Sequence, residues 1–106
     1  MFNFLRKSSG KVINVNDIDS LIGKIELIDI RETYEYKIGS IQTAKNIPMG
    51  MILDNPDKYL KKDKEYYIVC QSGGRSSKVS SKLVDLGFNI TNVAGGVGSY
   101  VGSKRK

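Results

Sequence analysis

Short runs of β-forming residues alternate with segments of helical character along this chain of 106 residues. The run over residues 25–30 is almost continuously apolar, as expected of a strand that is covered on both faces in a parallel sheet. Similar runs predict further strands at 12–15, 44–47, 65–69 and 88–93. The alternation predicts an α/β domain with a mostly parallel five-stranded sheet and helices on both faces.

Cap and stop residues mark the helical segments between these strands. Asn16 is a candidate cap for a helix over residues 17–22, and Gly23 can end it. A short helical turn is expected to begin at Glu32 or Thr33 and to stop at Gly39. Two further helices are predicted: one after Pro48, interrupted near Asn55 and Pro56, and one over 76–86, where Val79, Leu83 and Leu86 recur at helical spacing.

Composition and charge predict one domain with basic ends. We expect an N-terminal arm over 1–10, the domain over 11–102 and a basic C-terminal tail over 103–106. Seventeen Lys and Arg against eleven Asp and Glu give a net charge of +6, and six of the basic residues lie near the two ends. Solvated ends are the preferred interpretation, and a nucleic-acid or membrane surface is the alternative. Since no stretch is apolar enough for a signal peptide or a membrane span, a cytoplasmic setting is expected.

The single cysteine lies where a strand is expected to turn into a helix. Cys70 follows the apolar run 65–69 and precedes the predicted helix over 76–86. Glycines in such a turn let successive N–H groups point at one anionic centre, which favours a thiolate. Arg75 keeps its proton, so it can stabilise that thiolate and hold an anionic substrate. The candidate catalytic residues are therefore Cys70 and Arg75, with substrate binding by the turn residues Gln71, Ser72, Gly73, Gly74 and Ser76.

The absence of histidine from the sequence removes several kinds of chemistry. Cysteine hydrolases that use a histidine base are excluded. One cysteine without histidine also leaves too few of the usual ligands for zinc, and neither a metal nor another cofactor is expected. What remains is a thiolate that attacks an electrophile needing little proton transfer, and both sulfane sulfur and phosphoryl groups meet that condition.

Several segments together resemble the rhodanese family. The strand end Asp29-Ile30-Arg31 resembles its D-x-R motif, and residues 39–48, with Gly39, Ile41, Ala44 and the Asn-Ile-Pro at 46–48, resemble its G-H-I-x-x-A-x-N-I-P segment. The Cys70 loop resembles its active site, and residues 86–96 its closing strand and double glycine. Two positions depart from the family: Ser40 replaces the usual histidine, and Tyr100 stands near the place of a frequent tryptophan.

The resemblance implies a single-domain thiosulfate or persulfide sulfurtransferase. Its donor would be a small anion such as thiosulfate, and its acceptor an external thiol or a sulfur-acceptor protein, reached through a Cys70 persulfide. By the same resemblance Asp29 and Arg31 would support and border the active loop, although a structural ion pair or a helix-cap role is an equal alternative for each. A non-catalytic persulfide carrier that binds a protein partner is the second interpretation.

The length of the loop argues against a phosphatase. Cysteine phosphatases related to rhodaneses place five residues between cysteine and arginine so that the loop surrounds a tetrahedral phosphate. This chain has four, residues 71–74. The tighter ring fits the outer sulfur of a persulfide, whose charge the inward N–H groups would stabilise.

Overall fold

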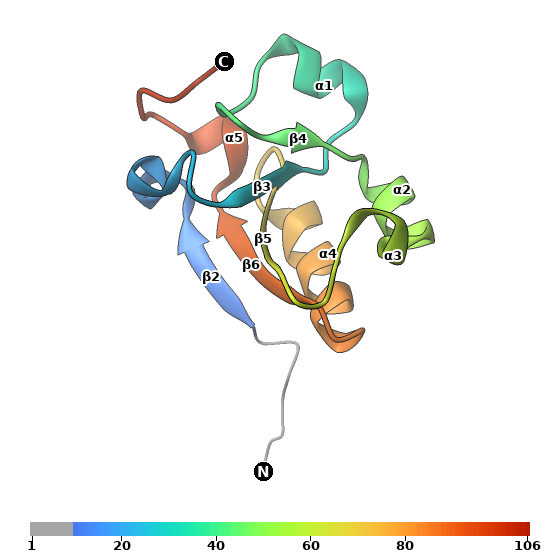
Figure 1. The fold of residues 1–106 in the computed structure, drawn as a ribbon. Helices are drawn as coiled ribbons and strands as arrows, with labels where there is room; N and C mark the ends of the chain where they lie inside the picture. Colours follow the sequence, from blue (N-terminus) through green and yellow to red (C-terminus); the bar gives the residue numbers. More distant parts are fainter. Residues whose placement is uncertain (1–9) are drawn as a thin grey trace.

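The computed structural model describes residues 10–106, so the predicted N-terminal arm lies outside the described residues except for Gly10. It contains a five-stranded sheet in the order β2-β6-β5-β3-β4, and every neighbouring pair is parallel (Figure 1). The predicted fold is confirmed. The strands are β2 (Lys11–Asn14), β3 (Glu26–Asp29), β4 (Lys45–Asn46), β5 (Glu65–Val69) and β6 (Asn89–Ala94).

Helices cover both faces of this sheet. The connections contain α1 (Thr33–Ile38), α2 (Met49–Asp54), α3 (Pro56–Tyr59), α4 (Gly74–Asp85) and α5 (Gly96–Ser99). The helix predicted over 17–22 is wrong in kind: the structure has two 3-10 turns, η2 (Val15–Asp17) and η3 (Asp19–Leu21). Asn14, not Asn16, accepts the capping hydrogen bond at 2.9 Å, and the two turns place Val15 and Ile18 in the core.

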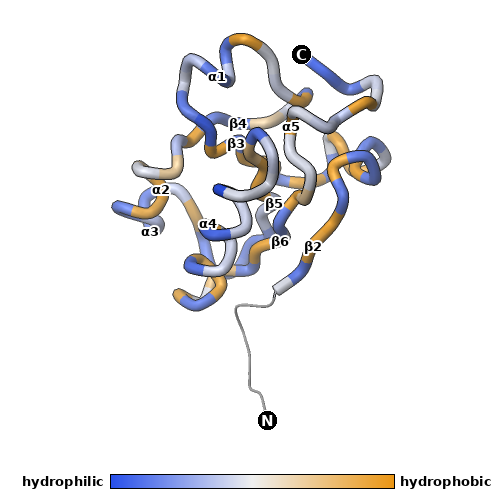
Figure 2. The backbone as a smooth tube through the Cα atoms, turned by 180° about the vertical axis from the view of Figure 1, so that it is seen from behind, coloured by the Kyte–Doolittle hydropathy of each residue, from blue (hydrophilic) through white to orange (hydrophobic). Residues whose placement is uncertain are grey.

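Two hydrophobic clusters lie on opposite faces of the sheet. Successive side chains of a strand point to opposite faces. Along β5, Tyr66 and Ile68 therefore join the cluster beneath α2 and α4, while Val69 joins the cluster beneath η2, η3 and α5. Apolar segments cross the middle of the molecule and the outer turns are largely hydrophilic (Figure 2). Cys70 continues the alternation onto the α4 side, where it is buried.

The C-terminal residues run back along the domain. Ile41 and Arg105 form an antiparallel bridge, and Ser40 and Lys106 exchange two backbone hydrogen bonds of 3.3 and 3.1 Å. The segment expected as a basic tail thus docks beside residues 40–42, and Nη2 of Arg105 donates to the carbonyls of Val97 and Tyr100 at 2.9 and 2.8 Å. Among the described residues, no helix is both long and apolar enough to cross a bilayer.

Candidate active site

The Cys70 loop occupies the carboxyl end of β5, between the strand and α4. Gly73 is the residue before the first turn of α4, and its φ of +106° lies in the left-handed region. A Cβ atom at Gly73 would also lie only 3.3 Å from the backbone nitrogen of Gly95. The tight turn therefore needs glycine at this position.

Two backbone hydrogen-bond donors of the loop and the hydroxyl oxygen of Ser76, which accepts from the thiol, surround the sulfur of Cys70. The backbone N–H groups of Gly73 and Ser76 donate to Sγ at 3.1 and 3.3 Å, and the Ser76 hydroxyl lies 3.4 Å from Sγ. Burial of Cys70 disfavours the charged form, but the hydrogen bonds from Ser76, Gly73 and Ser72 outweigh burial and lower the pKa of the Cys70 thiol below its usual value. Ser76, one of the predicted loop residues, has both a backbone and a side-chain contact with the sulfur.

Arg75 points to α1, where it meets a carboxylate that sequence reasoning did not assign to the site. Its Nη1 and Nη2 atoms donate to the two carboxylate oxygens of Glu35 at 2.8 and 2.9 Å. The hydrogen bonds from Arg75 hold the pKa of Glu35 at about 2, and the same pairing raises the pKa of Arg75. In this structure the two-pronged face of Arg75 that was expected to hold substrate binds Glu35.

A second ion pair lies behind the loop. Asp29 and Arg31 are buried, with 2.7 Å between Oδ2 and Nη2, and the Ser40 hydroxyl donates to the same Asp29 oxygen at 2.7 Å. Arg31 also donates to the side-chain oxygen of Gln71 at 2.9 Å and to the Gly39 carbonyl at 2.6 Å. The D-x-R pair therefore contacts the loop through Gln71, and Ser40 completes the hydrogen bonding of Asp29.

The first turn of α5 packs against the backbone of the loop. The N–H groups of Val97 and Gly98 donate to the carbonyls of Cys70 and Gln71 at 2.8 and 2.9 Å. A Cβ atom at Gly96 would lie 2.3 Å from the Gln71 carbonyl oxygen, and the φ of Gly96 is +71°. The double glycine lets this close approach occur.

Comparison with known proteins identifies the family. The model of the family described as "Rhodanese-like domain" matches residues 14–103. The chain belongs to the rhodanese-like domain family. Two solved structures are similar to it: a rhodanese-related protein of Thermoplasma volcanium, 36% identical with a TM-score of 0.76, and a rhodanese-like domain protein of Staphylococcus aureus, 34% identical with a TM-score of 0.75. The first match covers 86% of this chain and 90% of the other, and the second covers 87% and 94%.

Curated relatives point to sulfur chemistry, but several are longer proteins. YtwF of Bacillus subtilis (strain 168), named as a candidate sulfurtransferase, is 42% identical over 84 residues, covering 77% of this chain and 79% of its own length. The rhodanese-like family and this relative support a sulfurtransferase activity in general. Other matches are tRNA uridine(34) hydroxylases, of whose length this chain spans about a third.

The predicted site residues of this rhodanese-like domain differ in whether they contact the sulfur of Cys70. The backbone N–H groups of Gly73 and Ser76 donate to Sγ of Cys70. The backbone of Ser72 also helps to lower the pKa of Cys70, although Ser72 and Gly74 are exposed on the loop surface. Arg31, which is paired with Asp29, contacts the loop through Gln71, and Arg75 is paired with Glu35 of α1. Glu35 was missed because its partner is 40 residues away, although its place just beyond a strand end was a usable signal.

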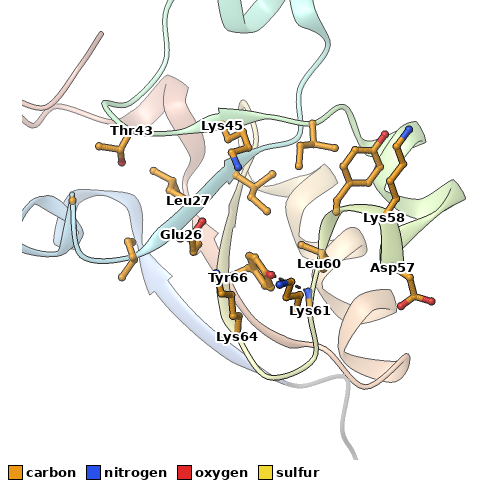
Figure 3. Close-up of a pocket in the computed structure, with 15 residues that line it drawn as sticks. Glu26, Leu27, Thr43, Lys45, Asp57, Lys58, Leu60, Lys61, Lys64 and Tyr66 are labelled. Carbon is orange, nitrogen blue, oxygen red and sulfur yellow. Dashed lines mark hydrogen bonds between the residues drawn. The ribbon is translucent and has the colours of Figure 1, made fainter.

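A pocket of about 430 Å³ lies away from the loop, beside the amino ends of β3 and β5 and next to α3 (Figure 3). Lys45, Lys58, Lys61 and Lys64 line it together with Leu60 and Tyr66. The residues of the Cys70 loop do not line it. Among residues 10–106 there is also no cluster of three or more potential metal-binding side chains.

Proposed function

We propose that this domain is a sulfurtransferase that accepts a sulfane sulfur on Cys70 from thiosulfate or a persulfide donor and passes it to an external thiophilic acceptor. The observation that carries the proposal is the set of hydrogen bonds at Sγ. Two backbone N–H groups and the Ser76 hydroxyl converge on a buried thiol whose pKa is lowered. That environment favours a thiolate nucleophile and stabilises a negatively charged sulfur adduct.

The reaction proceeds in two half-reactions. The Cys70 thiolate attacks the outer sulfur of thiosulfate, a sulfur–sulfur bond forms at Sγ, and the bond to the sulfonate sulfur breaks so that sulfite leaves with the electron pair. The resulting Cys70 persulfide then gives its outer sulfur to an incoming nucleophile, which restores the thiolate. Because the chain has no second cysteine, the acceptor comes from outside. Neither step needs a general base, which agrees with the absence of histidine.

The four-residue spacing between Cys70 and Arg75 supports sulfur transfer over phosphate hydrolysis. The N–H groups of Gly73 and Ser76 converge at 3.1 and 3.3 Å on the cysteine sulfur itself. A loop this tight suits a single additional sulfur atom rather than a tetrahedral phosphate.

A reducing compartment is the expected setting, since the free thiol of Cys70 must persist between turnovers.

The test is steady-state formation of thiocyanate from thiosulfate and cyanide. We expect measurable turnover in the parent protein and none in Cys70→Ser, because a hydroxyl cannot form a persulfide. Hydrolysis of an aryl phosphate by the same samples should be negligible, with folding checked by circular dichroism. Faster phosphate hydrolysis than thiocyanate formation would reject the proposal. Stoichiometric sulfur uptake without turnover would instead support the non-catalytic carrier.

A further inference from the structure

Sulfur donors for this site differ in the negative charge that they bring. When a thiolate attacks thiosulfate, the reacting groups together carry three negative charges, and the departing sulfite carries two of them. Attack on a cysteine persulfide breaks the bond between its two sulfurs and releases a cysteine thiolate. In this reaction the two reacting groups together carry only two negative charges. Neither reaction needs an added oxidant or reductant. The number of uncompensated cationic groups near Cys70 therefore influences which donor reacts faster.

The two arginines of the loop region are both neutralised by carboxylates. Arg31 is paired with Asp29 in the buried cluster behind the loop. Arg75 is paired with Glu35 through both of its terminal nitrogens, and the Arg75 side chain is 35% exposed against 19% for Glu35. Arg75 lies in the first turn of α4, one residue before Ser76, whose N–H donates to Sγ at 3.3 Å, and a charged Cys70 contributes to the raised pKa of Arg75. The guanidinium group of Arg75 is thus present beside the loop but paired with the carboxylate of Glu35.

Resting on the sulfurtransferase function proposed above, we propose that Glu35 is a specificity-determining residue that disfavours thiosulfate and directs Cys70 toward the singly charged persulfide of a cysteine thiol. Glu35 does this by occupying the two donor groups of Arg75 that would otherwise bind the sulfonate oxygens of thiosulfate. A cysteine persulfide has no sulfonate group and needs no such contact. Its charge is stabilised by the N–H groups of Gly73 and Ser76.

The structure offers a substitution that separates this electrostatic role from a structural one. Glu35 also accepts the backbone N–H of Glu32 at 2.9 Å and closes the capping box of α1. Glutamine keeps the shape and an oxygen acceptor for this cap, but it removes the charge that neutralises Arg75. Glu35→Gln is therefore expected to fold like the parent and to leave Arg75 available to an anionic donor.

The test compares how fast each donor converts Cys70 to its persulfide, followed by intact mass at short times. Thiosulfate and free cysteine persulfide are used with the parent, Glu35→Gln and Glu26→Gln. Glu26 is an exposed carboxylate of β3 that lines the remote pocket, so it controls for the loss of one negative charge. We expect the thiosulfate rate of Glu35→Gln to rise about tenfold while its cysteine persulfide rate changes about twofold or less. The gain should shrink as ionic strength rises, and Glu26→Gln should show none.

A double-mutant cycle assigns the effect to Arg75. In an Arg75→Met background, Glu35→Gln should no longer raise the thiosulfate rate, because the freed cation is absent. An unchanged donor ratio in Glu35→Gln, an equal gain in Glu26→Gln, or a gain that persists in the Arg75→Met background would each overturn the role of Glu35. Failure of both donors to place sulfur on Cys70 of the parent would instead overturn the proposed function itself.

Discussion

At the residue scale, the Cys70 sulfur combines burial with hydrogen bonds that favour its charged form. The side chain is 1% exposed, so desolvation alone would raise the pKa of the thiol. The backbone donors of Gly73 and Ser76 exist only because the chain turns tightly from β5 into α4. The reactivity of the Cys70 thiol therefore depends on the hydrogen bonds that this turn supplies, and a substitution at Ser76 should change it.

Ser76→Ala removes one of the contacts that lower the pKa of Cys70. The backbone N–H of residue 76 stays in place, but the substitution removes the hydroxyl that lies 3.4 Å from Sγ and donates to the Gly73 carbonyl at 3.2 Å. We expect the pKa of Cys70 to rise, which moves the pH profile of thiol alkylation to higher pH and slows alkylation at neutral pH. The control is Ser77→Ala, an exposed neighbour in α4. An alkylation profile that stays unchanged in Ser76→Ala would show that the backbone donors suffice.

At the element scale, the active loop is held between α1 and α5. The ion pair of Glu35 with Arg75 joins α1 to the start of α4, and the N–H groups of Val97 and Gly98 join α5 to the loop carbonyls. The six-residue α1 is too short to be stable alone, so its contacts with the rest of the domain position Glu35. Both contacts lead to measurable effects on stability.

The ion pair between α1 and α4 should make stability depend on pH in the acid range. The pKa of Glu35 is about 2 in the folded chain, against an ordinary 4.5. A carboxylate with a lowered folded pKa stabilises the fold above its unfolded pKa, and this contribution is lost as the pH falls from 4.5 toward 2. Because Arg75 is partly exposed, we expect Glu35→Gln to cost about 1 kcal/mol at pH 7 and less at pH 3.

Urea unfolding of both proteins at the two pH values measures this difference. A cost for Glu35→Gln that is as large at pH 3 as at pH 7 would show that the lost free energy comes from packing or capping and not from the ion pair.

Gly96→Ala tests the close contact of α5 with the active loop. The new methyl group would meet the carbonyl oxygens of Gln71 and Cys70 at 2.3 and 2.7 Å, at a φ of +71°. We expect the free energy of unfolding to fall by about 2 kcal/mol or more. Gly50→Ala is the matched control: Gly50 is an exposed glycine of α2 with nothing within 4 Å of its added Cβ. It should be neutral or stabilising by about 0.5 to 1 kcal/mol.

Both variants are measured by urea unfolding, and sulfur uptake by Gly96→Ala is then followed under conditions where it stays folded. Equal stability of Gly96→Ala and Gly50→Ala would contradict the tight packing of α5 against the loop.

At the scale of the whole molecule, the parallel sheet brings distant segments together at one edge. The carboxyl ends of β3 and β5 are adjacent, with Asp29 opposite Val69 in register. This brings Arg31 into contact with Gln71 of the loop, and α1, which follows β3, into contact with Arg75 through Glu35. The pocket lined by Glu26 and Lys64 begins at the amino ends of β3 and β5 and reaches Lys45 of β4, and the residues of the Cys70 loop do not line it (Figure 3).

The fold was predictable because its signals are local, whereas parts of the site were not. Apolar runs marked each strand, and the glycines of the loop marked the turn. The contact of Arg75 with Glu35 spans 40 residues, and the docking of Lys106 beside Ser40 spans a still longer stretch. Both depend on the assembled sheet rather than on sequence spacing. The 3-10 turns of η2 and η3 escaped prediction because burial of Val15 and Ile18 outweighs the helical pattern of residues 17–22.

The measurement that tests the central claim most directly is the intact mass of the purified protein before thiosulfate, after thiosulfate, and after subsequent cyanide. We predict a gain of one sulfur atom with thiosulfate, its complete removal with cyanide, and no gain in Cys70→Ser, because the Cys70 loop holds a single persulfide. An unchanged mass after prolonged exposure to thiosulfate and to cysteine persulfide, with Cys70 still free to be alkylated, would contradict the account.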